Sequence, residues 1–282
     1  MIINCKEIRE QEISQIKETY KGGCKVVFVQ AGNNPSSAVY VRNKIKLCEE
    51  VGIEVKHIQS DENISQNDLI KLINEFNADN NVHGIMVQLP LPDHINEKSI
   101  INAIAPEKDI DGFTTINKGR LMVGDENAII PCTPKGIMTI LEHENIDLKG
   151  KNVVIVGRSN IVGKPLANLM INAGATITVC NSKTDRERLY HCISNSDVFI
   201  SAIGQANYFT IDNFKCHTLN HTIAIDVGIN RDKEGKLCGD IDRDLYDEFK
   251  AVTSVPGGVG LMTVLEVIRN SIECYKRHID VI

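Results

Sequence analysis

The fold is decided by one stretch, Lys151-Asn-Val-Val-Ile-Val-Gly-Arg-Ser-Asn-Ile-Val-Gly-Lys-Pro165. Its residues 153–156 are all apolar and β-branched and run into Gly157, which predicts a strand buried on both faces in a parallel sheet. Apolar residues at helical spacing follow, and residues 175–180 then predict a second strand. Strand, glycine turn, helix and strand in this order form a βαβ unit, whose helix N-terminus can hold a phosphate.

The glycine turn leaves two interpretations open. It carries Gly157 and Gly163, with Ser159 between them, and it is not the G-x-G-x-x-G turn of dinucleotide-binding folds. Taken alone, it fits an ordinary turn of a parallel sheet as well as a cofactor site. The second strand ends without the acid that holds the ribose hydroxyls of NAD, whereas Arg158 and Lys183 suit a 2′-phosphate. We therefore expect NADP rather than NAD.

The composition excludes several classes of protein. With 282 residues the chain is long enough for two domains, each with its own core. A net charge of −6 without a long Lys/Arg block argues against a nucleic-acid partner. The nine cysteines form no C-x-x-C pair, so we expect reduced thiols in a cytoplasmic protein. No apolar run approaches a membrane span, so we expect no membrane partner.

One pair of histidines has the spacing of metal ligands on a helix. His217 and His221 are four residues apart, but the intervening Thr-Leu-Asn is a poor helix former. No third ligand is evident. We therefore expect a loop here and no metal in the protein.

Hydrophobic periodicity predicts alternating strands and helices along most of the chain. In the first half we expect strands at 24–30, 53–58 and 83–92, and helices at 5–20, 36–51, 65–77 and 96–104. In the second half we expect strands at 151–156, 175–180, 197–201 and 222–227, and helices at 131–144, 184–194 and 263–275.

This order predicts the α/β class, with two α/β lobes flanking a cleft, the second a Rossmann-like parallel-sheet NADP domain. We expect a catalytic domain over 1–140, with a C-terminal helix over 262–282 packing back on it, and the NADP-binding domain over 141–261. A cleft between two such lobes is a usual place for a cofactor to meet its substrate.

Several polar residues of the first lobe have two interpretations. The helix after Pro35 carries a core stripe, and Tyr40 and Lys44 form a neighbouring stripe that either faces a cleft or lies half-exposed with a snorkelling lysine. Gln88 sits at the C-terminal end of the third expected strand and is either a cap or a site residue. Asp111 precedes a glycine and can simply form a turn. The core stripe expected in this helix comprises Ala38, Val41, Ile45 and Cys48.

Two further segments mark the second lobe. Thr133 and Pro134 suit the N-cap and first positions of a helix. The cluster Val255-Pro-Gly-Gly-Val-Gly260 permits close approach of the backbone to a flat ligand, or simply makes a loop.

Taken together, six stretches resemble the bifunctional methylenetetrahydrofolate dehydrogenase/methenyltetrahydrofolate cyclohydrolase family. They occur in the family's order and span most of the chain. They are Tyr40-Val-Arg-Asn-Lys44, Val87-Gln-Leu-Pro-Leu-Pro92, Pro106-Glu-Lys-Asp-Ile-Asp-Gly-Phe113, Pro131-Cys-Thr-Pro134, Gly157-Arg-Ser-Asn-Ile-Val-Gly-Lys-Pro165 and Pro256-Gly-Gly-Val-Gly260.

The resemblance implies a bifunctional enzyme of one-carbon folate metabolism that serves purine biosynthesis. NADP takes a hydride from 5,10-methylenetetrahydrofolate, and water opens the resulting methenyl cation to 10-formyltetrahydrofolate. It also implies a homodimer, and tetrahydrofolate derivatives bound in the first lobe.

The resemblance further implies roles for single residues. Lys44 is the main catalytic residue, Gln88 its hydrogen-bond partner, Tyr40 a wall against the folate ring and Asp111 the anchor of the pterin. These residue types suit the chemistry, because a carboxylate accepts two adjacent N–H groups and an amine can accept and return a proton. Backbone at Gly257 and Gly258 lines the substrate. The residues implied for NADP are Gly157, Arg158, Ser159, Ser182, Ile229 and Thr133.

The chain departs from the family pattern at several loop positions, and none of these removes a proposed catalytic group. The first helix is shorter than usual, Thr114-Thr115 stands where His-Pro is common, and Asn181 stands where His is frequent. Prolines common in the family are absent at Ala206, Ser254 and Leu261.

Three alternatives stay open. The chain can be a dehydrogenase of this fold without cyclohydrolase activity, against which Lys44 and Gln88 argue. It can be a non-catalytic sensor that binds a dinucleotide, which would leave the four catalytic candidates without a purpose. It can also be another two-lobed NADP enzyme that acts on a different small acid.

Overall fold

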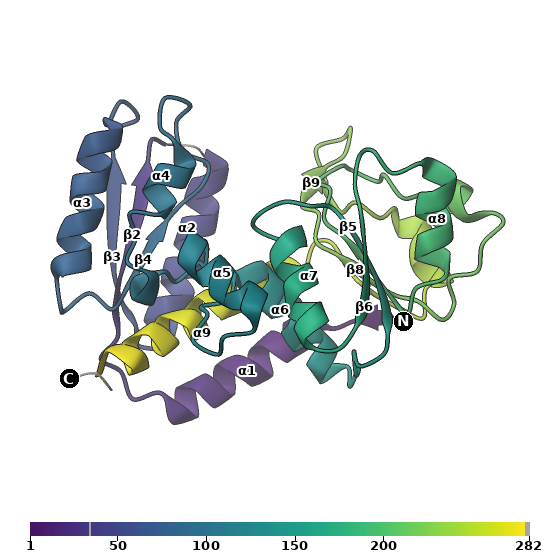
Figure 1. Ribbon diagram of the computed structural model, residues 1–282, viewed down its shortest axis with the longest axis horizontal. Helices are drawn as coiled ribbons and strands as arrows, with labels where there is room; N and C mark the ends of the chain where they lie inside the picture. Colours follow the sequence, from purple (N-terminus) through teal and green to yellow (C-terminus); the bar gives the residue numbers. More distant parts are fainter. Residues whose placement is uncertain (34, 280–282) are drawn as a thin grey trace. The chain divides into compact units, whose positions relative to one another are not determined.

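The computed structural model describes residues 1–33 and 35–279, and all of their side chains except those of residues 35–37, 39 and 40. The chain forms two compact α/β units, each built on its own parallel sheet (Figure 1). The six-stranded unit comprises Met1–Gln11 and Thr133–Thr263, and the three-stranded unit comprises Glu12–Cys132 and Val264–Ile282.

The sheet of the three-stranded unit has β2 at its centre, with parallel neighbours on both sides. The uninterrupted apolar run in β2 is buried because both edges are paired and both faces are covered. Val29 pairs with Val87, so Gln88 lies directly past the carboxyl end of this sheet. In sheet order the strands are β3 (Glu54–Ser60), β2 (Lys25–Ala31) and β4 (Gly84–Val87).

Helices of this unit begin and end at local capping interactions. Ser65 accepts a hydrogen bond from the amide of Asp68 and starts α3, which buries Leu69 and Ile73 against the sheet. Helix α5 was not predicted from the sequence. Thr114, one of the departures from the pattern of the resembling family, caps its N-terminus and so has a structural role. The helices are α2 (Pro35–Glu50), α3 (Gln66–Ala78), α4 (Glu97–Ile101) and α5 (Thr115–Val123), with a 3-10 turn η1 (Pro106–Lys108).

The sheet of the six-stranded unit is parallel throughout. Strands β6 and β7 follow β5 in the chain but lie on opposite sides of it, so the topology switches direction between β5 and β7. Open α/β sheets bind ligands at such a point, outside the carboxyl ends of the strands. The order is β1 (Ile2–Ile3), β11 (Ala251–Thr253), β8 (Ile223–Asp226), β7 (Val198–Ser201), β5 (Asn152–Val156) and β6 (Thr176–Cys180).

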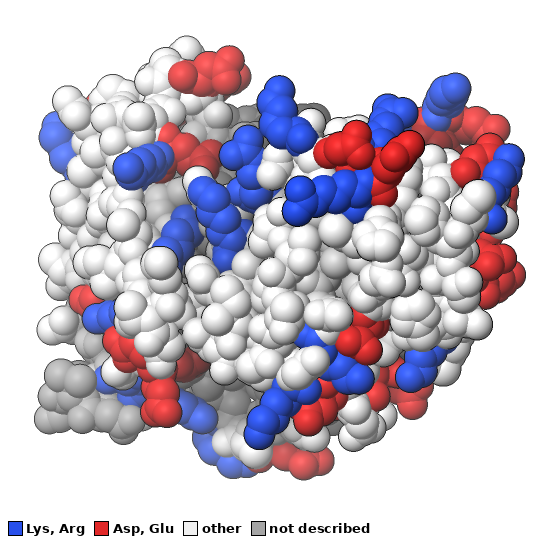
Figure 2. All heavy atoms as spheres, turned by 45° about the vertical axis from the view of Figure 1, so that its right-hand side comes forward, with Lys and Arg blue, Asp and Glu red and all other residues white. Residues whose placement is uncertain are grey.

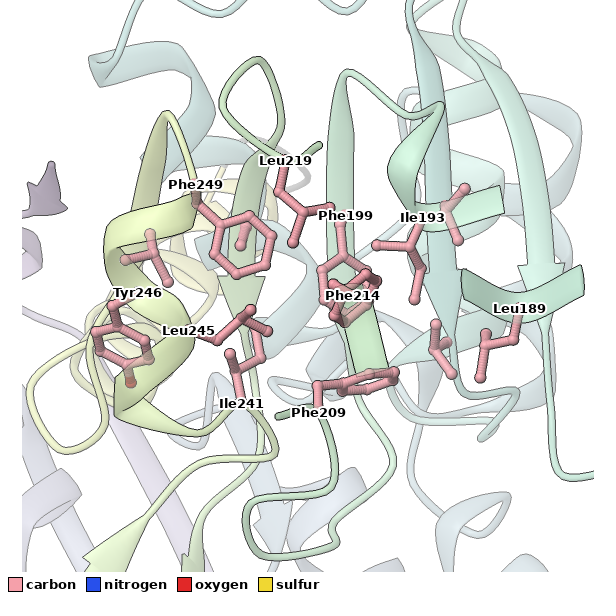
Figure 3. Close-up of a cluster of buried hydrophobic side chains, with 14 of the residues drawn as sticks. Leu189, Ile193, Phe199, Phe209, Phe214, Leu219, Ile241, Leu245, Tyr246 and Phe249 are labelled. Carbon is pink, nitrogen blue, oxygen red and sulfur yellow. The ribbon is translucent and has the colours of Figure 1, made fainter. Parts of the chain in front are cut away.

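An aromatic cluster covers one face of this sheet (Figure 3). Phe199 of β7 lies at its centre and meets Phe209 edge to face, with ring centroids 5.1 Å apart. Leu189 and Ile193 of α8 pack against the same cluster. The remaining elements are α7 (Gly163–Asn172), α8 (Arg186–Ser194), the hairpin β9 (Asn230–Arg231) and β10 (Leu237–Cys238), and the 3-10 turns η2 (Ile211–Phe214) and η3 (Arg243–Glu248).

The chain has three further helices, and the last of them begins earlier than the sequence predicts. Within α9, Gly260 lies in the first turn, so the end of the glycine cluster is helical. Strands β1 and β11 were also not predicted, because two or three residues carry no readable alternation. The three helices are α1 (Cys5–Thr19), α6 (Cys132–His143) and α9 (Val259–Ile279).

The surface carries charges of both signs. On the face drawn in Figure 2, positive side chains gather near the upper middle and the two signs alternate elsewhere. This face therefore lacks the broad positive field typical of nucleic-acid-binding proteins. Within residues 1–33 and 35–279, no helix is both long and apolar enough to cross a bilayer.

Candidate functional site

Lys44 lies on the buried face of α2. Its exposed fraction is 9%, and Val41 and Leu47, one turn away on either side, are buried as well. Ile45, which the sequence analysis placed in the core stripe, is only half-buried. The core stripe is therefore rotated from the predicted one, and the lysine belongs to it. A buried lysine needs polar partners, because burial disfavours its charge.

The ammonium group of Lys44 faces the end of β4. Its Nζ lies 3.2 Å from Sδ of Met86 and 3.5 Å from Oε1 of Gln88. A thioether is a weak acceptor, so the amide oxygen is the stronger partner of the two. The Nε2 of Gln88 donates to the carbonyl of Leu89 at 2.6 Å, which turns its oxygen toward the lysine.

Asp111 lies within electrostatic reach of the same lysine. Burial raises the pKa of the Asp111 carboxyl, the charge of Lys44 lowers it, and Asp109 raises it. The Sγ of Cys132 lies 4.0 Å from its Oδ1. The structure thus brings Lys44, Gln88 and Asp111 together in the three-stranded unit.

The loop that carries Asp111 is held by Asp109, whose role the sequence analysis did not recognise. The buried carboxylate of Asp109 accepts hydrogen bonds from the amides of Phe113 and Thr114 and from the side chain of Asn117. Gly112 follows with φ +67°, and a Cβ there would lie 2.5 Å from the carbonyl of Ile129. The turn is therefore possible only with glycine.

Two more buried polar residues support this loop. The Nδ2 of Asn270 on α9 donates to the carbonyls of Ile110 and Ile130, each at 2.8 Å. The ammonium of Lys108 donates to three carbonyls at the C-terminus of α3, those of Phe76, Asn77 and Asp79. Sequence alone gave no signal for either role, because both depend on contacts between distant segments.

Tyr40 is the remaining catalytic candidate. Its backbone lies in α2, one turn before Lys44. Its side chain lies outside the described part of the structure.

The Gly157 turn of the six-stranded unit is a backbone cradle. Gly157 has φ +129°, and a Cβ on it would lie 2.4 Å from the carbonyl oxygen of Ala202. A Cβ on Gly163 would lie 2.2 Å from the oxygen of Gly157. Ser159 accepts hydrogen bonds from the amides of Val162 and Gly163 at the start of α7. The turn thus leaves no room for side chains at its glycines, as a close phosphate site requires.

The loop after β6 is ordered by its own side chains. Asn181 accepts from the amide of Lys183 at 3.0 Å, and Thr184 accepts from the amide of Asn181 at 3.0 Å. Ser182 and Lys183 are exposed, as is Arg158 in the Gly157 turn. These exposed groups fit an anionic ligand, and no described acid stands at the end of β6 to repel it.

The structure shows the local contacts of two predicted cofactor residues, Thr133 and Ile229. Thr133 does not cap a helix, because α6 begins one residue earlier, at Cys132. Its Oγ1 lies 3.1 Å from Oγ1 of Thr263. Ile229 is 46% exposed, an unusual position for a large apolar side chain. Glycine at 260 accommodates it, because a Cβ there would lie 3.2 Å from Cδ1 of Ile229.

The glycine cluster forms a tight turn before α9. Gly257 has φ +100°, and a Cβ on Gly258 would lie 2.4 Å from the carbonyl of Ser254. Ser254, a departure from the family pattern, donates from its hydroxyl to the carbonyl of Pro256 at 3.1 Å. A local hydrogen bond therefore supports this turn where the family often has proline.

His217 and His221 lie in the loop that follows η2, outside any helix. Among the residues that the structure describes, no three His, Cys, Asp or Glu side chains gather as metal ligands.

Comparison with protein families assigns both halves of the chain. Residues 3–111 match the catalytic domain of the tetrahydrofolate dehydrogenase/cyclohydrolase family, and residues 131–279 match its NAD(P)-binding domain. The chain belongs to the tetrahydrofolate dehydrogenase/cyclohydrolase family. The resemblance proposed from six sequence stretches is thus confirmed at the level of the family.

Relatives in this tetrahydrofolate dehydrogenase/cyclohydrolase family are similar over nearly their full length. The bifunctional protein FolD of Bacillus subtilis is 42% identical over 275 residues, which cover 96% of this chain and 95% of the relative. The structure of bifunctional FolD from Campylobacter jejuni is 40% identical and aligns with a TM-score of 0.92, covering 98% of this chain and 99% of that one. The Trypanosoma brucei enzyme, solved with NADP cofactor and an inhibitor, is 30% identical with a TM-score of 0.88, covering 99% of this chain and 98% of that one.

Proposed function

We propose that the protein oxidises 5,10-methylenetetrahydrofolate to 5,10-methenyltetrahydrofolate with NADP and then hydrolyses it to 10-formyltetrahydrofolate. The observation that carries this proposal is the buried ammonium of Lys44, 3.5 Å from Gln88 and within electrostatic reach of Asp111. A dehydrogenase alone has no need of such a group, because hydride transfer depends mainly on positioning.

Lys44 serves the hydrolytic step. In this step Lys44 reacts as the neutral amine: water adds to the methenyl carbon between N5 and N10 and gives one proton to that amine. The bond from this carbon to N5 then breaks as Lys44 returns the proton to N5, the hydroxyl proton of the adduct passes to solvent water, and the formyl group remains on N10. One residue can act as base and then as acid when it stays within hydrogen-bond reach of both sites. Gln88 holds the Nζ of Lys44 in place for this exchange.

Asp111 anchors the pterin. A carboxylate can accept two parallel hydrogen bonds from adjacent N–H groups, which fixes both the position and the orientation of a planar ring. Lys44 favours the ionised form of Asp111, whereas burial opposes it. The hydrogen bonds through Asp109 and Asn270 hold the loop in place before the substrate arrives. Tyr40 is assigned as the wall against the folate ring by family resemblance.

The cofactor belongs to the six-stranded unit. NADP supplies a nicotinamide carbon that accepts the hydride. The glycine cradle at 157 and 163 binds the pyrophosphate, and the exposed groups of Arg158 and Ser182 bind the 2′-phosphate. We assign Ser159, Ile229 and Thr133 to the same cofactor. This preference for NADP rests on the lack of an acid after β6.

The remaining assignments follow the family. Gly257 and Gly258 present backbone to the substrate. We assign a catalytic domain over 1–140 together with the C-terminal helix, and an NADP domain over 141–261, although Met1–Gln11 and residues 133–140 belong to the same compact unit as the NADP domain. The protein works in the cytoplasm.

We also infer a homodimer. Strand β6 lies at the edge of the six-stranded sheet, and Val179 on it is 40% exposed. Exposed edge strands invite pairing and are usually covered. A two-fold axis next to β6 would pair this edge with the same edge of a second copy.

One experiment separates this function from the alternatives. Purified protein is given the methenyl compound without a dinucleotide, and release of 10-formyltetrahydrofolate is followed. A dehydrogenase without cyclohydrolase activity, or a sensor, leaves the methenyl compound to decay at its rate in buffer.

A further inference from the structure

Asp240 is a completely buried carboxylate that takes no part in the proposed chemistry. Its two oxygens accept hydrogen bonds from five neutral donors. Oδ2 accepts from Ser201 Oγ (2.8 Å), Ile203 N (2.9 Å) and Gly204 N (3.3 Å), and Oδ1 accepts from Gln205 N (2.9 Å) and Asn230 Nδ2 (2.9 Å). A buried charge is tolerated when so many N–H and O–H groups converge on it.

These donors lie at the switch point of the sheet. Ser201 is the last residue of β7, and the loop 202–205 continues from the carboxyl end of that strand. The amide of Ala202 donates to Val156 at the end of β5, and Gly157 packs against the carbonyl of Ala202. Asn230 follows Ile229 directly, on the segment after β8. Asp240 therefore joins the loops after β7 and β8 beside the glycine cradle.

The backbone of Asp240 is also held, by hydrogen bonds to buried residues. Its own amide donates to the buried carboxyl of Asp226 at 3.0 Å, and its carbonyl accepts from Phe209 at 3.0 Å. The next residue, Ile241, is part of the aromatic cluster in Figure 3. Because both the backbone and the side chain of Asp240 are held by hydrogen bonds, this residue can fix the positions of the loops that donate to it.

The position of Asp240 requires a carboxylate. A carboxylate has acceptors only, so all five donors are satisfied at once. An asparagine would aim its own N–H₂ group at N–H donors. Glycine at 228 is required too, because a Cβ there would lie 2.1 Å from Oδ1 of Asp240. Nothing in the sequence pattern distinguishes Asp240 from a residue of an ordinary turn.

We propose that Asp240 is a positioning residue for the nicotinamide cofactor, which fixes the loop 202–205 and the segment 229–230 in the shape that NADP binds. This inference rests on the proposed function of the six-stranded unit. It predicts that a change at Asp240 separates the two activities of one polypeptide, because methenyl hydrolysis uses Lys44 and needs no dinucleotide.

The test compares Asp240→Asn with the unchanged protein in three measurements. NADPH binding is titrated directly in the absence of folate, KM for NADP is measured in the dehydrogenase reaction, and methenyl hydrolysis is measured without dinucleotide. We expect the Kd and KM for the cofactor to rise about tenfold or more, since hydrogen bonds to a charged group are lost. Hydrolysis should stay within about twofold of the unchanged protein, because it uses residues of the three-stranded unit and needs no dinucleotide. Asp212→Asn, at an exposed aspartate paired with Lys215, is the matched control and should change neither activity.

Two further variants cover the case in which Asp240→Asn does not fold. Ser201→Ala and Asn230→Ala each remove one donor and keep the carboxylate. Each should raise the Kd for NADPH a few-fold, which corresponds to the loss of roughly one hydrogen bond. Each should leave the rate of hydrolysis unchanged. Unchanged NADPH affinity in all folded variants, or a parallel loss of hydrolysis and cofactor binding, would overturn the inference. Absence of hydrolysis in the unchanged protein would instead refute the proposed function, and the NADPH titration would still decide the role of Asp240.

Discussion

The Nζ of Lys44 lies 3.5 Å from Oε1 of Gln88, although the two residues are 44 positions apart in the chain. The parallel pairing of β2 with β4 brings Gln88 to the carboxyl end of the sheet, and the core stripe of α2 turns Lys44 toward it. This pair is the centre of the proposed hydrolytic site.

Lys44→Ala should slow methenyl hydrolysis by about 10²- to 10⁴-fold, the usual contribution of a general acid–base group. Binding of NADPH should be unchanged, because the cofactor belongs to the other unit. The measurement is the decay of methenyl absorbance together with a fluorescence titration of NADPH. Lys46→Ala, on the exposed face of the same helix, is the control and should hydrolyse normally. Normal hydrolysis by Lys44→Ala would remove the lysine from the mechanism.

Substitutions at Asp111 and Asp109 should have different effects, because Asp111 is proposed to bind folate whereas Asp109 holds the loop. Asp111→Ala should weaken folate affinity about tenfold to a hundredfold, because hydrogen bonds to a charged acceptor are lost. Its melting temperature should not fall, since burial already disfavours this charge. Asp109→Ala should lower the melting temperature, because three donors lose their acceptor. Calorimetry with a folate analogue and thermal melts test both, and equal folate affinity of Asp111→Ala would contradict the anchor role.

Gly157→Ala should impair cofactor binding and leave hydrolysis intact. The new Cβ meets the carbonyl of Ala202 at a φ that alanine avoids, at a cost on the order of 1–3 kcal/mol. NADPH affinity should fall about tenfold or more. The control is Gly119→Ala, in α5, where a Cβ meets nothing within 4 Å. It should stabilise the protein by about 0.5–1 kcal/mol, as alanine does in a helix. Full NADPH affinity in Gly157→Ala would argue against the cradle.

His83 should make the stability depend on pH. Burial, followed by the charges of His278 and Lys108, lowers the pKa of His83, and its Nδ1 accepts from the amide of Lys25. The folded protein therefore keeps His83 neutral where the unfolded chain takes up a proton, near pH 6.5. This contribution is present above about pH 6.5 and is lost progressively as the pH falls below that value and through the lowered pKa of His83 in the folded protein.

Urea unfolding at about pH 8 and about pH 5.5 measures the effect, on either side of the histidine pKa. In His83→Asn the free energy of unfolding should change less between the two values than in the unchanged protein. His221→Asn, at an exposed loop histidine, should leave the difference as it was. An identical difference in all three proteins would show that His83 does not titrate differently on folding.

Val179→Lys should convert a homodimer to a monomer, because two lysines would face each other across the paired edges. Sedimentation equilibrium measures the mass of both proteins. Ile171→Lys, at a residue 55% exposed on α7, is the control and should remain dimeric. A dimer that survives Val179→Lys would place the interface elsewhere.

The sequence correctly predicted the strands and helices whose formation depends on the pattern of neighbouring residues. The apolar run ending at Gly157 became β5, and the helical spacing after it became α7. Gln88 was expected at the C-terminal end of a strand over 83–92, and it lies directly past β4, which ends at Val87. Strand β1 was missed because two residues carry no pattern, although burial of Ile3 in the sheet is almost complete.

The residues that sequence reasoning missed act through distant partners. Asp109 and Asp111 stand in the same short turn, and nothing in their spacing shows that Asp109 is the one that holds the loop through three hydrogen bonds. Asn270 contacts carbonyls 140 and 160 positions away. Asp240 carries no signal in the sequence, because the groups that donate to its carboxylate come from two other loops. The NADP, folate and catalytic assignments of single residues stay predictions.

The most direct measurement of the central claim follows one reaction at two wavelengths. Purified protein receives 5,10-methylenetetrahydrofolate with NADP or with NAD, and the absorbances of reduced dinucleotide and of the methenyl species are recorded together. The account predicts NADPH formation with little methenyl accumulation, 10-formyltetrahydrofolate as product, and a much slower reaction with NAD. Methenyl that accumulates in step with NADPH and decays no faster than in buffer would contradict it.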